Sequence, residues 1–124
     1  MMNLLKRAPA RFKKSFGYCW DGIKDTFVKE ESFRLETIAF FVLLFALLTA
    51  QVCTSWPTWK TLVMLASYLF IPLTEILNSA IENLCDFATR EHAELIKNAK
   101  DKGALAVLFT IVLNALVLVA LILM

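Results

Sequence analysis

The sequence predicts an all-α integral membrane protein, in which an N-terminal amphipathic surface helix precedes three transmembrane helices within one domain, residues 1–124. The composition supports this prediction, since 59% of the 124 residues are hydrophobic and the mean hydropathy is +0.65. Only three glycines and three prolines are present to interrupt helices. In addition, three apolar stretches are each long enough to cross a hydrocarbon core about 30 Å thick.

The first element is the surface helix, which we expect over residues of about 10–30. Its large apolar residues recur every three or four positions, so they share one stripe of a helix. They are Phe12, Phe16, Trp20, Ile23 and Phe27. Lysines lie off this stripe, which favours a helix in the cytoplasmic interface with its lysines near anionic head groups. Packing of the stripe on a neighbouring subunit is the alternative, and both arrangements are compatible.

Three membrane spans follow a charged corner at residues 30–36. We expect the spans at about 36–53, 61–81 and 103–124. The turn between the first two contains Pro57, which breaks a helix, and two tryptophans that suit an interfacial belt. The second span is expected to continue without a break into the polar segment that precedes the third.

Basic residues are unevenly distributed. Eight Lys or Arg precede the first span, one (Lys60) lies in the first turn, and four lie in the second connection. The positive-inside rule therefore places the N-terminus and the second connection in the cytoplasm, with the C-terminus on the opposite side. A nucleic-acid partner is not expected, because the basic excess adjoins a span and no recognition motif accompanies it.

The stretch from Glu75 to Asp86 sets three carboxylates on the second span. At 3.6 residues per turn, Glu75, Glu82 and Asp86 fall within about 40° of one another, with Asn78 beside them. Glu75 follows Lys60 by about 22 Å of helix, near the inner boundary of the hydrocarbon, and Glu82 lies about 10 Å further on. This order suggests transfer between a lipid and a water-soluble group. The alternative is a polar contact between helices of an oligomer.

These residues suggest roles in such a transfer. Glu75 is the candidate general base on a lipid hydroxyl. Glu30 and Glu82, both expected at head-group level, are candidates to share one Mg²⁺ with phosphate oxygens. Lys100, followed by Asp101, ends the cytoplasmic segment where a positive charge can reach a phosphate. With glycine only at positions 17, 22 and 103, the chain lacks a glycine-rich phosphate loop, so metal and side chains must hold any nucleotide.

The carboxylate stretch resembles the signature of the prokaryotic diacylglycerol kinases, E-x-[hydrophobic]-N-[ST]-[SA]-[hydrophobic]-E-x-x-[VI]-D. It reads Glu75-Ile-Leu-Asn-Ser-Ala-Ile-Glu-Asn-Leu-Cys-Asp86, which departs from the signature only at Cys85. The resemblance extends to residues 17–22, to the corner at 30–36, and to residues 99–108 at the entry to the third span.

The resemblance implies a homotrimeric enzyme of the bacterial cell inner membrane, with a cytoplasmic N-terminus and a periplasmic C-terminus. It implies that the enzyme phosphorylates diacylglycerol with MgATP to give phosphatidate, with Glu75 as the base and Glu30 and Glu82 on the metal. The implied nucleotide contacts are Arg11, Tyr18, Glu30, Glu82, Glu91, Lys100 and Asp101. The implied lipid contacts are Arg11, Ser32, Phe33, Arg34, Glu36 and Glu75. Asn78 and Asp86 would support the site.

The chain also departs from the family pattern elsewhere. Glu91-His92-Ala93 stands where the family typically has Glu-Tyr-His, Ala104 replaces a serine, and Cys19 replaces a small hydroxyl residue.

Two other functions stay open on the sequence. Undecaprenol kinases share the signature but phosphorylate a polyprenol, although the corner at Phe33-Arg34-x-Glu36 looks more like the diacylglycerol branch. A small oligomeric proton-coupled transporter, with Glu75 as a proton relay, would need no nucleotide site. Because three spans of one chain cannot enclose a site, we expect completion across a subunit boundary, with the Glu36 corner reaching the Glu75 of a neighbour.

Overall fold

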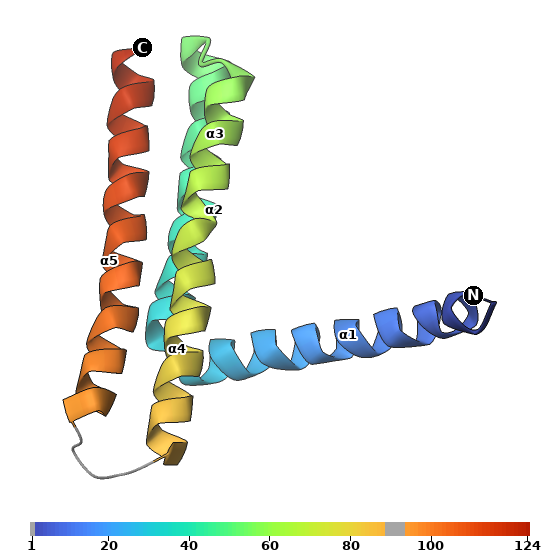
Figure 1. The fold of residues 1–124 in the computed structure, drawn as a ribbon. Helices are drawn as coiled ribbons and strands as arrows, with labels where there is room; N and C mark the ends of the chain where they lie inside the picture. Colours follow the sequence, from blue (N-terminus) through green and yellow to red (C-terminus); the bar gives the residue numbers. More distant parts are fainter. Residues whose placement is uncertain (1, 89–93) are drawn as a thin grey trace. The chain divides into compact units, whose positions relative to one another are not determined.

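The computed structural model describes residues 2–88 and 94–124, with side chains from Arg11 onward, and every element in these ranges is a helix (Figure 1). The helices are α1 (Met2–Lys29), α2 (Glu31–Thr54), α3 (Thr58–Tyr68), α4 (Phe70–Ala88) and α5 (Glu94–Leu123). The chain forms two units, residues 1–31 and 32–124, and each is described by itself.

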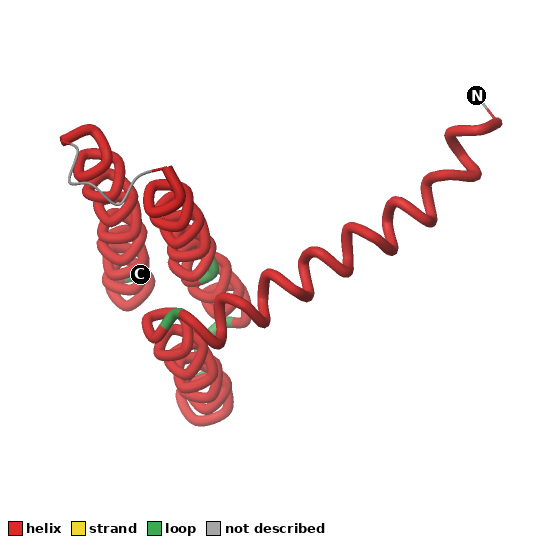
Figure 2. Tube along the Cα trace, turned by 90° about the horizontal axis from the view of Figure 1, so that it is seen from below, coloured by secondary structure: helices red, strands yellow, loops and turns green. Residues whose placement is uncertain are grey.

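The three expected spans are present. By length and composition, α2, the run of α3 and α4 from Thr58 to Ala88, and α5 are each able to cross a membrane. Figure 2 shows these helices nearly end-on. The all-α fold with three spans is therefore confirmed.

The helices extend beyond the expected membrane spans, because nothing in the sequence stops them where the charges begin. Between α1 and α2 only Glu30 is outside a helix, so the charged corner is mostly the first turn of α2. Similarly, α5 begins at Glu94, well before the apolar run that starts at Gly103. A single glycine costs a helix only about 1 kcal/mol relative to alanine, which is too little to end one.

The turn between α2 and α3 occupies residues 55–57. Ser55 has a positive φ of 55°, uncommon for a residue other than glycine. Pro57, with φ −70° and ψ 139°, then leads into α3. The Gln51 amide donates to the Thr61 hydroxyl at 2.7 Å across this turn, which fixes the two helices as an antiparallel pair.

The second span continues into the polar segment as far as Ala88, as predicted, but it has one interruption near its middle that the sequence analysis did not anticipate. Leu69 separates α3 from α4, although hydrogen bonds from Leu69 N to Leu65 O (3.1 Å) and from Leu73 N to Leu69 O (3.3 Å) continue on both sides. Pro72 explains the break, because it has no N–H to donate to the carbonyl of Tyr68 four residues earlier.

Polar contacts join the α3–α4 run to α5 in antiparallel register. Lys60 Nζ donates to Leu121 O at 2.6 Å, and Asn114 Nδ2 donates to Ser67 Oγ at 2.9 Å. Seven residues separate these contacts on each helix. The hydroxyls of Thr74 and Thr110 follow at 3.0 Å, and Asn78 meets Gly103 beyond them. The recurrence at about seven residues is that of helices packed at a shallow angle.

Little apolar surface is buried within one chain. The buried cluster consists of Leu47, Met64 and Leu121, with Leu43, Trp56, Leu65 and Val117 against it. Only 6%, 22% and 11% of the apolar windows of the three spans are buried. The remaining apolar faces are therefore available to lipid or to other subunits.

Candidate functional site

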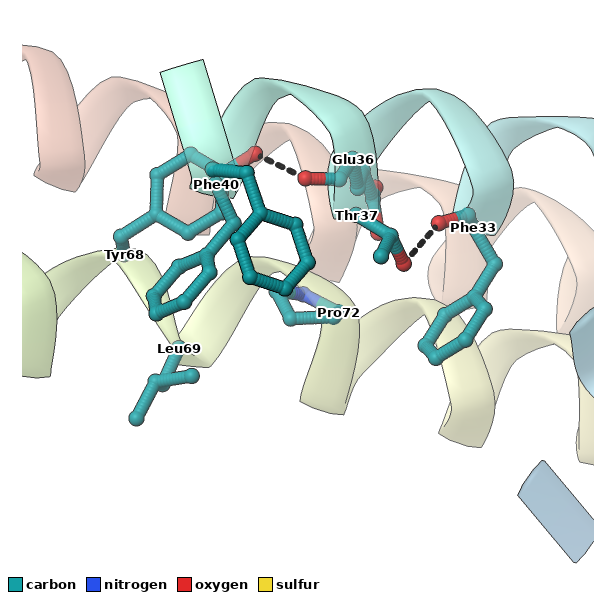
Figure 3. A pocket seen from close by; sticks show the side chains of 8 residues that line it. Phe33, Glu36, Thr37, Phe40, Tyr68, Leu69 and Pro72 are labelled. Atoms are coloured by element: carbon teal, nitrogen blue, oxygen red, sulfur yellow. Dashed lines mark hydrogen bonds between the residues drawn. The ribbon is translucent and has the colours of Figure 1, made fainter. Parts of the chain in front are cut away.

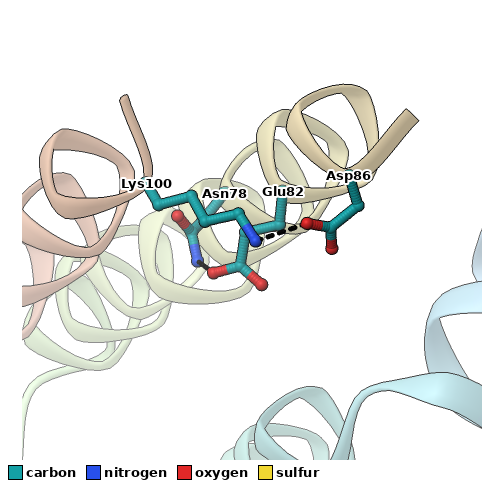
Figure 4. Close-up of polar contacts among 4 residues, drawn as sticks. All are labelled: Asn78, Glu82, Asp86 and Lys100. Carbon is teal, nitrogen blue, oxygen red and sulfur yellow. Dashed lines mark hydrogen bonds and ion pairs between the residues drawn. The ribbon is translucent and has the colours of Figure 1, made fainter. Parts of the chain in front are cut away.

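A polar cluster lies between the C-terminal part of α4 and the N-terminal part of α5 (Figure 4). Its members are Asn78, Glu82 and Asp86 from one face of α4 and Lys100 from α5. The Asn78 amide donates to Glu82 Oε1 at 3.0 Å. Since Asn78 and Glu82 are one helical turn apart, this bond holds the Glu82 carboxylate in one orientation and leaves its second oxygen for another partner.

Lys100 connects the two helices of the cluster. Its ammonium group donates to Asp86 Oδ1 at 2.6 Å, and it is close enough to Glu82 for the two charges to attract. The Lys100 side chain is 36% exposed and that of Asp86 67%, so both are accessible from water. The exposed pair contributes little stability, but it places a cation beside two carboxylates.

Gly103 makes the approach of the two helices possible. A Cβ at this position would clash with Asn78 Oδ1 and lie 3.2 Å from its Cγ, so any side chain there would displace the amide. Asn78 Oδ1 is buried and has no hydrogen-bond partner within the described part of the chain. The site thus presents one acceptor oxygen for a donor that is not among these residues.

Two further carboxylates, Glu75 and Glu36, lie outside this cluster, on α4 and α2. Glu75 is half-buried on α4, seven residues before Glu82 and on the same face. Glu36 of α2 is near enough to Glu75 for the two charges to act on each other. Tyr68 fastens this arrangement, since its hydroxyl donates to Glu36 O at 2.7 Å. Glu36 is therefore within electrostatic reach of the Glu75 of its own chain, whereas the sequence analysis expects it to reach the Glu75 of a neighbouring subunit.

A cavity of about 220 Å³ adjoins Glu36 between α2 and the α3–α4 run (Figure 3). We call it the side chamber. It is lined by Phe33, Glu36, Thr37, Phe40, Phe41, Tyr68, Leu69 and Pro72. The Phe40 and Tyr68 rings pack with centroids 5.8 Å apart. Sequence reasoning missed Phe40, Tyr68 and Pro72, although the spacing of seven residues between Tyr68 and Glu75 was a readable signal.

The other predicted site residues fall into three groups. Arg11, Tyr18 and Glu30 belong to the N-terminal unit, where Lys14 Nζ lies 5.9 Å from the Tyr18 ring centroid, so their joining the cluster stays a prediction. Glu91 lies outside the described residues. Asp101 is exposed, and its carboxylate lies 3.8 Å from Lys97 Nζ, one turn earlier on α5.

The predicted corner on α2 divides in the structure. Phe33 and Glu36 line the side chamber, whereas Ser32 and Arg34 do not. Ser32 is exposed in the first turn of the helix, and Arg34 is half-buried.

The cluster fits a magnesium ion carried on phosphate. Mg²⁺ usually keeps several waters and takes one or two carboxylates together with phosphate oxygens. Glu82, oriented by Asn78, offers one such oxygen, and Asp86 lies one turn further along the same face. The described residues bring no three His, Cys, Asp or Glu side chains together.

Comparison with known proteins gives a consistent result. The family model described as prokaryotic diacylglycerol kinase matches residues 17–123. The chain is 34% identical to a diacylglycerol kinase of Escherichia coli (strain K12) over 105 residues, which cover 82% of this chain and 80% of the relative. It is 31% identical to a diacylglycerol kinase of Helicobacter pylori over 108 residues, 86% of this chain and 80% of the relative. It is 32% identical to an undecaprenol kinase of Bacillus subtilis over 107 residues, 86% and 84% of the two chains.

Proposed function

Because the chain belongs to the prokaryotic diacylglycerol kinase family, we propose that it phosphorylates the hydroxyl of diacylglycerol with MgATP to give phosphatidate and ADP. The observation that carries the proposal is the order of groups along α4. With the expected topology, Glu75 is at lipid depth, and Glu82 and Asp86 follow on the same face in the direction of water. Lys100 donates to Asp86 from α5. A lipid hydroxyl and a nucleotide phosphate can therefore meet along one helix face. Membership of a kinase family favours this chemistry over the transporter alternative.

In the proposed reaction, the Glu75 carboxylate accepts the proton of the lipid hydroxyl as its oxygen bonds to the γ-phosphorus of ATP. The bond from the γ-phosphorus to the β–γ bridging oxygen breaks, and ADP leaves with that electron pair. Lys100, held by Asp86, offers its remaining N–H donors to the phosphate oxygens. Asn78 keeps Glu82 in the orientation needed to bind the metal. Mg²⁺, when bound by Glu82 and the predicted second ligand Glu30, would neutralise phosphate charge.

The remaining predicted contacts belong to the same proposal. Arg11, Tyr18, Glu91 and Asp101 would contact the nucleotide, and Arg11, Ser32, Phe33, Arg34 and Glu36 the lipid. We propose a bacterial inner membrane location, a cytoplasmic N-terminus and site, a periplasmic C-terminus, and a homotrimer. The basic N-terminal unit and the largely unburied spans support these assignments.

Undecaprenol kinase is the second candidate, favoured by the 32% identity to the Bacillus subtilis enzyme. To separate the two, the purified protein in lipid nanodiscs is given MgATP with diacylglycerol or undecaprenol, and phosphorylated lipid is measured. We expect the diacylglycerol rate to be the higher. A higher rate on undecaprenol would show that the substrate is a polyprenol and that the chemistry is the same. If neither lipid is phosphorylated, the proposed function is wrong.

The role of Glu75 has its own test. Glu75→Gln keeps the shape of the side chain but removes its basicity, so the rate should fall by about 10² to 10⁴. Size-exclusion chromatography checks that the variant still assembles. Glu94→Gln, an exposed carboxylate in the first turn of α5, is the matched control. Near-normal turnover in Glu75→Gln would falsify the assignment.

A further inference from the structure

We propose that the side chamber receives part of an acyl chain of the diacylglycerol whose hydroxyl is presented to Glu75, and that Phe40 and Tyr68 select the chains that fit. This inference rests on the proposed function and deepens it. It turns a general lipid-facing corner into a binding chamber with defined walls, most of which come from residues that carry no assigned role.

The first argument is depth. Pro72 and Tyr68 precede Glu75 by three and seven residues, so they lie about 4.5 and 10 Å from it along the helix axis, in the direction of the middle of the span. Both are within about 60° of Glu75 around the helix. A lipid with its hydroxyl at Glu75 extends its chains toward the middle of the membrane, along the face where the chamber opens.

The second argument is continuity with the carboxylates. Glu36 lines the chamber and is also within electrostatic reach of Glu75. One oxygen of Glu36, Oε2, is buried without a hydrogen-bond partner among the described residues. The chamber therefore joins an apolar volume to a polar group at the side nearest the proposed reaction, which suits a molecule with an apolar chain and an oxygen-bearing head.

The third argument is the way the chamber is formed. Pro72 interrupts the helix at Leu69, and both residues line the cavity. The hydrogen bond from Tyr68 to Glu36 O holds α2 in place beside this break. The volume of about 220 Å³ exceeds the roughly 150 Å³ in which an apolar cavity takes up benzene, so a segment of chain has room to enter.

The side chamber is expected to select among acyl chains rather than to raise the affinity for the lipid. A lipid chain already lies in apolar surroundings, so moving it from the bilayer into the chamber gains little hydrophobic free energy. What the aromatic walls add is shape, because close packing accepts chains that fit and excludes those that do not.

The test is photolabelling of the full chain in phosphatidylcholine nanodiscs with a diacylglycerol that carries a diazirine within one acyl chain. The labelled residues are mapped by mass spectrometry. We expect label within residues 33–41 and 68–72, reduced at least five-fold by excess unlabelled diacylglycerol and unaffected by additional phosphatidylcholine. Undecaprenol is a second competitor, and displacement by undecaprenol alone would overturn the assignment to an acyl chain.

Variants of α2 provide the controls. Phe40→Trp fills the chamber and should lower the competed label at least five-fold, whereas Phe40→Leu, which leaves it open, should retain the label. Phe45→Trp makes the same exchange at a side chain that is 74% exposed and lines no part of the chamber, so labelling should not change. Circular dichroism and gel filtration show that each variant is folded.

Kinase activity is measured on the same nanodiscs, so that the two proposals fail separately. Activity without competed label in the chamber, or equal label in Phe40→Trp and wild type, would overturn the inference and leave the proposed function standing. Competed label without activity would remove the proposed function and keep the chamber as a diacylglycerol site.

Discussion

At the scale of single residues, Gly103 and Asn78 depend on each other. Gly103 is the point where α5 comes closest to the Asn78 amide, and the same amide orients Glu82. The glycine therefore acts on the polar cluster without contacting a substrate. Asn78 is a positioning residue in this arrangement, since it works through the carboxylate that it holds.

Replacing Gly103 by alanine should impair the site. The added Cβ would clash with Asn78 Oδ1, so the amide must move and the bond to Glu82 is lost. We expect the kinase rate to fall by about 10²-fold and the Mg²⁺ concentration for half-maximal rate to rise. The free energy of unfolding should drop by about 1 to 3 kcal/mol.

Gly22→Ala is the matched control, because its Cβ would meet no atom within 4 Å. That exchange should instead stabilise α1 by up to about 1 kcal/mol. An unchanged Mg²⁺ dependence in Gly103→Ala would show that Asn78 does not position Glu82.

Lys60 caps the C-terminus of α5, a structural role that its position in a short turn of the sequence does not suggest. Its side chain is buried, its ammonium group donates to Leu121 O in the last turn of α5, and the ring of Trp56 lies 4.9 Å from Nζ. The carbonyls at a helix C-terminus carry partial negative charge and lack partners within the helix, so a buried cation caps them well.

Lys60→Met removes the charge but keeps the aliphatic stem, so the free energy of unfolding should fall by about 2 kcal/mol. The kinase rate should stay close to wild type, because Lys60 lies at the opposite end of the span from Glu82. Chemical unfolding in detergent and the lipid kinase assay measure the two effects. Lys24→Met, an exposed lysine over Trp20, is the control and should change stability little. A loss of activity with unchanged stability would contradict the capping role.

At the scale of helices, the contact between the α3–α4 run and α5 shows what the sequence pattern could and could not predict. The apolar length of each span predicted the three helices. The sequence did not predict the seam of polar contacts between them, formed by Ser67, Thr74, Thr110 and Asn114, since small and polar residues about seven apart also occur on lipid-facing helices. The break at Leu69 was readable from Pro72, but local propensity does not say how far a proline bends a packed helix.

The seam can be tested by a double-mutant cycle on Ser67→Ala and Asn114→Leu. The Asn114 amide donates to the Ser67 hydroxyl at 2.9 Å, so the two substitutions should couple. Interhelical hydrogen bonds in membrane proteins average about 0.6 kcal/mol and reach about 1.7 kcal/mol, and we expect a value in this range. Pairing Ser67→Ala with Thr49→Ala is the control, because the Thr49 hydroxyl donates to Phe45 O within its own helix. Equal coupling in both cycles would show that the seam adds no specific stability.

At the scale of the molecule, most of the apolar surface of the three spans is not buried within one chain, so lipid or other subunits must cover it. The chain separates into two units, and the predicted site residues divide between them. One unit contains Arg11, Tyr18 and Glu30. The other contains Glu36, Glu75 and the polar cluster. Sequence spacing predicted the carboxylate order on α4, because one helix fixes it. It did not predict that α2 returns to bring Glu36 to Glu75, since the Tyr68 hydrogen bond that fastens them links residues 32 positions apart.

The mixing of two inactive subunits tests this arrangement in the proposed homotrimer. Sequence reasoning assigns the Glu36 corner to a neighbour of the subunit that carries Glu75, and mixed trimers of Glu36→Gln and Glu75→Gln would then regain activity at the interfaces that contain both intact residues. In the structure, the Glu36 and Glu75 carboxylates of one chain are within electrostatic reach of each other, so we propose that they serve the same site. Every site in a mixed trimer would then lack one of them, so we expect activity to stay at the level of the separate variants.

Differently tagged subunits are co-purified so that only mixed trimers are assayed, and wild type mixed with Glu75→Gln is the control that should retain part of the wild-type rate. Recovery of activity in the mixture of Glu36→Gln and Glu75→Gln would show that α2 serves the site of a neighbour in the working enzyme. The contact between Glu36 and Tyr68 would then hold α2 in place without completing the site of its own chain.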